Sequence, residues 1–328
     1  MKARIIGGGL SGATAAVMLK SAGYAVRLFE TRPHIAGNCY DSVLGGTMTH
    51  NYGPHFFHTD DKEVFGFLSR FTDWTEYKHR PKGETKLGLI SLPYSKKTKS
   101  ELGRELTQEE ITDVIFRDYS EKQWGVPFSE VPRTITNRIP KTQDCEDPSW
   151  FEGQEYQCLP KDGYTQMVSR MLEGVEVILG SAKTEWKDYD ADITIYTGKI
   201  DEYFSYVYGD LPYRSLDLEH TITSRRLPCA VINHNTRSTP YTRSYDNAYF
   251  TESHTETTVI TRELPKECGR SDIPFYPIPF GSGLKTYAKY KDLADRESRV
   301  VFVGRLATYT YLDMWMAIKQ VLLRFKNV

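Results

Sequence analysis

The sequence lacks a net charge of either sign and any long apolar run. Its 42 basic and 43 acidic residues nearly cancel, which argues against the strong positive field that binds nucleic acid or an anionic membrane surface. No apolar run approaches the ~20 residues that a membrane span needs. Nothing resembling a secretory signal precedes the first predicted strand. We therefore expect a cytoplasmic protein that binds neither nucleic acid nor a membrane.

Cysteines and short catalytic motifs are also scarce. The five cysteines are odd in number and widely spread, with no CxxC pair, which favours reduced thiols over a disulfide framework or a zinc site. There is no GxSxG motif and no legible nucleophile–histidine–acid triad. A second glycine fingerprint, which a separate nicotinamide domain would need, is missing too. The sequence therefore predicts no protein nucleophile and no metal centre.

What the chain does have is a glycine-rich turn close to its N-terminus. The predicted order is strand, turn, helix, strand and acid, at residues 2–6, 7–12, 13–22, 25–29 and Glu30. Gly7 permits the tight turn, Gly9 lets backbone N–H groups approach a pyrophosphate, and Gly12 lets helix and strand pack closely. Glu30 can accept hydrogen bonds from a ribose diol. This framed GxGxxG predicts a dinucleotide site.

The end of the chain mirrors its start. Residues 299–303 form a predicted strand, Gly304 follows, and a helix is predicted over 312–325. An early GxGxxG and a late strand–glycine–helix unit can share one sheet, with other domains inserted between them. That layout is commoner in FAD proteins than in NAD dehydrogenases, so we favour FAD over NAD.

Between these ends the pattern predicts mixed structure. Residues 62–71 favour a helix, 86–94 alternate like a strand, and 107–124 favour a helix that begins with a capping pattern at Thr107. From about residue 194 to 278 the sequence is strand-rich. The 328 residues suffice for two or three domains.

Several histidines, arginines and aromatic residues are candidates for the site, each with a plainer alternative. His55 and His58 follow a loop that would lie against a flavin ring, but they could also merely bond loop carbonyls. Tyr119 and Trp124 could flank a planar base or pack in the core. Arg243, beside a tyrosine, suits a diphosphate or a surface salt bridge. These residues predict a pocket for a phosphorylated ligand.

The sequence also resembles the bacterial-type UDP-galactopyranose mutases over nearly its whole length. The matching stretches, in order, are residues 37–40, 52–59, 119–125, 138–140, 195–198, 200–204, 213–216, 240–243, 275–277, 304–307 and 311–313. The resemblance implies an α/β fold with a Rossmann-like FAD-binding domain of discontinuous segments, a small helical domain and a mainly antiparallel sheet domain. The implied bounds are 1–80, 160–200 and 285–328 for FAD, 95–137 for the helices, and 81–94, 138–159 and 201–284 for the sheet domain with its mobile lid.

The resemblance implies an isomerase that uses a redox cofactor without net oxidation. In such enzymes N5 of reduced flavin attacks the anomeric carbon of UDP-galactopyranose and displaces UDP. The flavin–sugar adduct opens to an iminium, the sugar recloses through O4 as a five-membered ring, and UDP returns to the anomeric carbon as the flavin leaves. The implied partners are a UDP-galactose-type nucleotide sugar and an electron donor such as NAD(P)H, with a homodimer as a possibility. The remaining alternatives are a flavin amine oxidase or desaturase, and a non-catalytic relative that binds UDP-sugars.

The resemblance also implies roles for individual residues of this chain. The implied catalytic residues are Arg138, Arg243, His55 and Tyr311. The implied substrate contacts are Tyr119, Trp124, Trp150, Arg214, Tyr276 and Asp313. The implied FAD contacts are Gly7, Gly9, Ser11, Gly12, Glu30, Asn38, His55, His58, Gly304, Arg305, Asp313 and Met314.

Two departures from the family pattern stand out. Trp150 occupies a lid position where the family commonly has tyrosine, so the contact of that hydroxyl group is in doubt. The stretch from Leu92 to Tyr119, where the family's helical domain and dimer contacts lie, is markedly shorter than usual. Both departures leave room for another sugar, such as UDP-N-acetylgalactosamine or a deoxy sugar.

Overall fold

The N- and C-terminal segments meet in one parallel sheet. A computed structural model of the chain describes residues 1–136, 142–181, 184–251 and 256–326. The five strands of the sheet run in the order β10 (Glu176–Leu179), β2 (Ala25–Glu30), β1 (Lys2–Ile6), β11 (Ile193–Tyr196) and β17 (Val300–Phe302). All neighbouring pairs are parallel. The prediction that both ends of the chain share one sheet is therefore confirmed.

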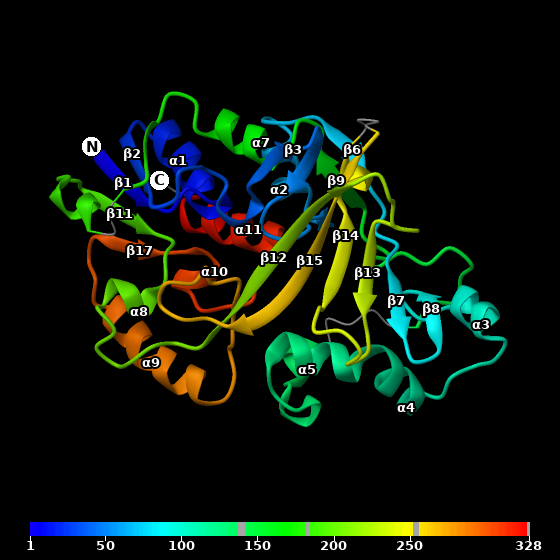
Figure 1. Ribbon diagram of the computed structural model, residues 1–328. Coiled ribbons are helices and arrows are strands. Elements are labelled where there is room, and N and C mark those ends of the chain that lie inside the picture. Colours follow the sequence, from blue (N-terminus) through cyan, green and yellow to red (C-terminus); the bar gives the residue numbers. More distant parts are fainter. Residues whose placement is uncertain (137–141, 182–183, 252–255, 327–328) are drawn as a thin grey trace.

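Helices cover one face of this sheet. They are α1 (Leu10–Ser21), α7 (Tyr164–Met171) and α11 (Met314–Arg324), and α1 packs on the other two (Figure 1). Ala3, Ile5 and Leu28 point into this interface and are fully buried, with α1 contributing alanines and leucines. Helix α1 begins three residues before the predicted Ala13, because Gly9 caps it and Gly12 lies in its first turn. Small side chains there bring α1 close to the glycine turn.

A larger, mainly antiparallel sheet fills the predicted strand-rich part of the chain. Its order is β16 (Tyr276–Pro277), β12 (Tyr213–Thr223), β15 (Thr258–Glu267), β14 (Arg243–Asp246), β13 (Val231–His234), β7 (Lys82–Thr85) and β8 (Gly88–Ser91). Only the β13–β7 pair is parallel among these described strands. The strand predicted over 86–94 is present but shorter, as β8, because the chain turns at residues 86–87 and β8 pairs back on β7 as a hairpin.

Short helices lie at one end of this large sheet (Figure 1). In order they are α3 (Lys96–Leu102), α4 (Gln108–Ile111), a π-helical segment Thr112–Arg117, α5 (Asp118–Trp124), a 3₁₀ turn Phe128–Glu130 and α6 (Arg133–Thr136). The predicted cap is confirmed, because Thr107 and Glu110 form a reciprocal capping box. A small core of Ile90, Leu92 and Ile115 joins these helices to β8.

The remaining elements form two small sheets, further helices and 3₁₀ turns. They are the strands β3 (Asp41–Leu44), β4 (Thr47–His50), β5 (Phe57–Thr59), β6 (Trp74–Glu76) and β9 (Tyr156–Pro160), the helices α2 (Lys62–Leu68), α8 (Ile200–Tyr203), α9 (Ser282–Ala294) and α10 (Gly304–Ala307), and the 3₁₀ turns Gly37–Cys39, Glu185–Asp188 and Asn247–Phe250. The domain bounds stay a prediction. In the described ranges, none of the helices is both long and apolar enough to cross a membrane.

Candidate active site

The glycine turn is packed so tightly that larger residues would not fit. A Cβ atom at Gly12 would overlap the carbonyl oxygen of Gly7 and lie 3.3 Å from Cγ2 of Ile5. A Cβ atom at Gly37 would lie 3.0 Å from the Cα atom of Gly9. The loop after β2 therefore packs against the glycine turn through Gly37, which contacts Gly9. The glycines of the turn carry no side chains there, so a pyrophosphate could approach the backbone closely at this edge of the parallel sheet.

Glu30 and Arg32 add charge to this edge. Glu30 is only 6% exposed, and its carboxylate accepts from the backbone N–H groups of Gly8 at 2.7 Å and Arg32 at 2.9 Å. Arg32 donates from Nη2 to Asn38 Oδ1 at 2.8 Å and lies over the ring of Tyr52. Its Nη1 atom is buried with no hydrogen-bond partner among the described residues. A buried, unpaired cationic donor beside the glycine turn fits a bound dinucleotide.

A cavity of about 610 Å³ lies between the large sheet, helix α5 and the start of α11. Twelve of the predicted site residues line it: Asn38, His55, His58, Tyr119, Trp124, Trp150, Arg243, Tyr276, Arg305, Tyr311, Asp313 and Met314. They come from segments far apart in the sequence. The structure therefore brings them together, while the role of each stays a prediction.

Arg243 and Glu263 form the central ion pair of this cavity. The two residues are direct cross-strand partners on β14 and β15. Nε and Nη2 of Arg243 donate to the carboxylate at 2.7 and 3.0 Å, and the Glu263 side chain is 0% exposed. Burial opposes the charge, but Glu263, Tyr119 and Tyr276 raise the pKa of Arg243 well above its ordinary value. The pair fixes a permanent cation in the cavity wall.

Three aromatic rings that line the cavity pack against one another. Trp124, Tyr276 and Tyr311 meet edge to face, with ring centroids 5.6–6.3 Å apart. The guanidinium of Arg305 lies 5.8 Å from the centre of the Tyr276 ring and 5.5 Å from that of Tyr311. Burial raises the pKa of Tyr119 to about 12. The phenol of Tyr119 is therefore a neutral hydrogen-bond donor at neutral pH.

Two of the histidines that line the cavity, His55 and His79, are neutral. Burial lowers the pKa of His55 to about 3 and that of His79 to about 3. His55 Nδ1 bonds the carbonyl of Gly53 at 2.8 Å. For this ring nitrogen, the contact agrees with the alternative that His55 bonds a loop carbonyl. His58 Nδ1 lies 2.7 Å from Gln154 Oε1. The ring of His58 stacks on that of Phe151, with the ring centroids 3.6 Å apart. Together with Phe56 and Phe151, these rings give the cavity an aromatic lining.

We expect these buried histidines to make the fold sensitive to mild acid. His50, His55 and His79 have folded-state pKa values of about 4, 3 and 3, whereas the unfolded chain binds their protons near pH 6.5. The unfolded state therefore binds more protons below pH 6.5, and stability falls as the pH falls. Between pH 7 and 5.5 the loss in unfolding free energy should be about 4 kcal/mol. Denaturant unfolding at both pH values measures it.

The control for this prediction is His79→Phe, because the ring of His79 stacks between Phe56 and Phe151 and phenylalanine fits that stack. The variant should lose less stability than the wild type over the same pH range. An unfolding free energy that does not change from pH 7 to 5.5 would contradict the prediction.

Some predicted residues lie elsewhere. Arg214 is expected among the substrate contacts, but it does not line the cavity; it lies behind α5, where it donates to the carbonyls of Gln123 and Lys122 at 2.8 and 3.1 Å. The backbone leaves those carbonyls unpaired at the end of the helix, so the guanidinium pairs there. Ser11 and Gly304 pack against each other at the glycine turn. Arg138 lies outside the described residues.

The sequence analysis missed other residues of the cavity. His79, Asn233 and Asn235 line it, and Glu263 anchors Arg243. A signal for Glu263 exists, since it shares the buried face of β15 with Val259 and Thr261, where a lone carboxylate needs a cationic partner. No comparable pattern marks the asparagines, whose place depends on how β13 meets α5.

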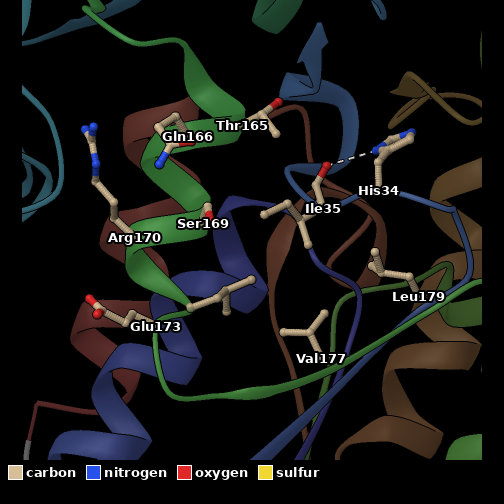
Figure 2. Close-up of a pocket in the computed structure, with 10 residues that line it drawn as sticks. His34, Ile35, Thr165, Gln166, Ser169, Arg170, Glu173, Val177 and Leu179 are labelled. Atoms are coloured by element: carbon tan, nitrogen blue, oxygen red, sulfur yellow. Dashed lines mark hydrogen bonds between the residues drawn. The ribbon is translucent and has the colours of Figure 1, made fainter.

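A second cavity, of about 690 Å³, lies between α7, β10 and the loop at His34 and Ile35. Figure 2 shows the polar side chains of α7 on one side and Val177 and Leu179 on the other. His34 bonds the carbonyl of Ile35 at 2.9 Å and the hydroxyl of Tyr52 at 2.8 Å, so both ring nitrogens are engaged.

Comparisons with known proteins agree with this geometry. The family profile described as UDP-galactopyranose mutase matches residues 114–311, and that of an NAD(P)-binding Rossmann-like domain matches residues 5–71. The chain is 34% identical to a probable UDP-galactopyranose mutase of Klebsiella pneumoniae (97% of this chain, 92% of the relative) and 32% identical to a dTDP-fucopyranose mutase of Escherichia coli (97% and 96%). A crystal structure of reduced UDP-galactopyranose mutase matches with a TM-score of 0.77 at 13% identity, covering 99% of this chain and 93% of that one.

Proposed function

The chain belongs to the UDP-galactopyranose mutase family, and from this premise we propose that it binds FAD and interconverts a nucleotide sugar's pyranose and furanose forms. The proposed substrate is UDP-galactopyranose or a close relative such as UDP-N-acetylgalactosamine, with activity only in the reduced state of the flavin. An electron donor such as NAD(P)H and a homodimer stay predictions.

The observation that carries the proposal is the buried Arg243–Glu263 pair in the cavity wall. A bidentate contact with a fully buried carboxylate orients the guanidinium and leaves Nη1 for another acceptor. Tyr119 and Tyr276 lie close enough to influence its charge. The guanidinium of Arg243, with these neutral phenols beside it, could donate hydrogen bonds to the oxygens of a diphosphate. An amine oxidase has no need of such a group for its substrate.

The residues at the sheet edge fit the proposed cofactor. The glycine turn would hold the pyrophosphate, Glu30 the ribose, and the unpaired Nη1 of Arg32 a further polar group. When bound and reduced, a flavin supplies the nucleophilic N5 atom that forms a bond with the anomeric carbon of the sugar. Asp313 is the N-cap of α11 and lines the cavity, so the positive end of the helix dipole would favour negative charge there.

The chain's own side chains would bind and orient the substrate. Nη1 of Arg243 would donate to a diphosphate oxygen both before and after the diphosphate separates from the sugar, which stabilises the charge on that oxygen. Tyr119 and Trp124 would contact the base and ribose. The neutral rings of His55 and Phe56 exclude water from the sugar end without adding charge.

The test is anaerobic turnover of three substrates with and without dithionite. They are UDP-galactofuranose, its N-acetylamino analogue and a thymidine-diphosphate deoxy sugar, with products separated by chromatography. Pyranose product only in the reduced samples supports the proposal and ranks the sugars. Consumption of oxygen with an amine would support an oxidase instead. UDP binding without any product would indicate a relative that only binds nucleotide sugars.

Trp150 offers a test of substrate choice. Its indole lines the cavity, packs on the small core around Ile115 and meets the ring of His79 edge-on at 6.3 Å. Trp150→Tyr should shift preference toward UDP-galactose by about two- to tenfold, because one added hydrogen bond is worth ~0.5–1.5 kcal/mol. Competition between UDP-galactofuranose and its N-acetylamino analogue measures the shift. Trp74→Tyr, outside the cavity, is the control, and an unchanged ratio would show that the departure is neutral.

A further inference from the structure

The ammonium group of Lys122, on helix α5, lies inside a loop of backbone carbonyls. Nζ lies 2.9 Å from the oxygen of His234, 2.7 Å from Thr236, 3.3 Å from Thr239 and 2.6 Å from Tyr241. An ammonium has three donors, so four acceptors saturate it. The turn between β13 and β14 is therefore wrapped around a cation that belongs to another element.

The same helix end is held from the opposite side. Arg214 of β12 donates to the carbonyls of Lys122 and Gln123, and a Cβ atom at Gly125 would lie 2.8 Å from Nη1 of this arginine. Helix α5 is thus fixed between β12 and the β13–β14 turn. The carbonyls at the end of α5 accept from Arg214, and Lys122 of α5 donates to the carbonyls of the turn.

Both elements contribute walls of the cavity. Tyr119, Gln123 and Trp124 of α5 line it, and so do Asn233 and Asn235, at and just after the end of β13. The Asn235 amide donates to the carbonyl of Ile115, just before α5, while its Oδ1 is buried without a partner among the described residues. The distance between the walls therefore depends on what holds the turn against the helix.

We propose that Lys122 is a positioning residue for nucleotide binding: by fastening the turn at residues 234–241 to α5, it fixes the spacing between the two walls that enclose the nucleotide end of the substrate. This inference rests on the proposed function, because it takes the ligand to be a nucleoside diphosphate. Lys122 does not line the cavity and acts through Trp124, Tyr119 and the asparagines.

The exposed counterpart of this contact is Arg237, in the same turn. Arg237 is paired with Asp118 and Glu121 of α5, but its side chain is 69% exposed. Solvent-exposed ion pairs contribute ~0–1 kcal/mol, whereas hydrogen bonds to a charged, half-buried group contribute ~1.5–3 kcal/mol. Arg237 therefore provides a matched control that links the same two elements.

The charges around Lys122 predict how the contact depends on pH. Asp118 and Glu121 lie on α5, Glu84 on β7, and His234 and Arg237 on the turn. Burial lowers the pKa of Lys122 to about 8, with Asp118 and Glu84 opposing the shift and Arg237 adding to it. Above that pH the amine has two donors for four carbonyls. The turn is then held less firmly. An arginine at this position would stay protonated over the same pH range, so its contact with the turn should not weaken.

The experiment measures UDP affinity by titration of the flavin-bound protein, together with flavin content and melting temperature. Lys122→Met should raise the Kd of UDP about tenfold, which is ~1.4 kcal/mol. Arg237→Met should stay within about twofold. Wild-type affinity should weaken between pH 7.5 and 9.5, and that of Lys122→Arg should not.

The outcomes separate this inference from the proposed function. A lower melting temperature of Lys122→Met with unchanged UDP affinity would show a purely structural role and overturn the inference. If Lys122→Met does not fold, the pH series decides: an affinity that is flat to pH 9.5 in both the wild type and Lys122→Arg overturns it. A wild type that binds UDP but isomerises no sugar defeats the proposed function and leaves the Lys122 measurement valid.

Discussion

Replacing Arg243 by alanine should lower kcat/KM for the nucleotide sugar at least about a thousandfold, which is ~4 kcal/mol of transition-state stabilisation. The bound flavin should remain, because Arg243 belongs to β14 and lies away from the glycine turn. A buried, oriented cation is worth more than an exposed one, since no water competes with it for the phosphate. Steady-state kinetics with reduced enzyme and the flavin absorbance measure the two effects.

The ion pair requires a second variant beside the alanine. Removing Arg243 alone leaves the carboxylate of Glu263, which is 0% exposed, without its counter-ion, at a cost of ~3–5 kcal/mol in stability. The double variant Arg243→Met, Glu263→Gln removes both charges and should regain stability but not activity. Arg262→Ala is the control, because Arg262 is the exposed neighbour of Glu263 on β15. Turnover near the wild-type level in the double variant would refute the assignment.

The pair also shows what the sequence could and could not predict. Arg243 is found from its neighbours in the chain and from a family resemblance. Glu263 is 20 residues further on, and its role depends on the register that pairs β14 with β15. A pattern of alternation predicts that both segments are strands. It does not predict that these two residues face each other, because register is set by contacts across the sheet.

The parallel sheet was the most predictable part of the fold. The glycine turn and the alternation of strand and helix are local signals, so β1, β2 and the C-terminal strand β17 are found within a residue or two. The strand predicted over 86–94 begins at Gly88 instead, because alternation alone does not show where a hairpin turns. Arg214 shows another limit: its neighbours in sequence match a substrate site, but its guanidinium donates to the carbonyls of Gln123 and Lys122 at the end of α5.

The glycines of the turn allow the cofactor site to be tested separately from the fold. A methyl group at Gly12 would overlap the Gly7 carbonyl, which belongs to backbone and cannot move aside. Gly12→Ala should therefore lose both flavin and stability. At Gly9 the methyl would lie 3.8 Å from the nearest atom, the Cα of Gly37, and φ is −79°. The protein itself therefore accepts alanine at Gly9.

Gly9→Ala should keep the melting temperature of the cofactor-free protein and weaken FAD binding about tenfold or more, because the methyl takes the space through which a pyrophosphate reaches the backbone. Gly66→Ala is the matched control, since its methyl meets nothing within 4 Å in helix α2, and it should gain ~0.5–1 kcal/mol. The measurements are FAD titration and thermal unfolding with and without FAD. Stabilisation by FAD depends on the ratio of its concentration to Kd. The stabilisation by FAD should therefore be smaller in Gly9→Ala and unchanged in Gly66→Ala. Equal stabilisation of the two variants would place the dinucleotide elsewhere.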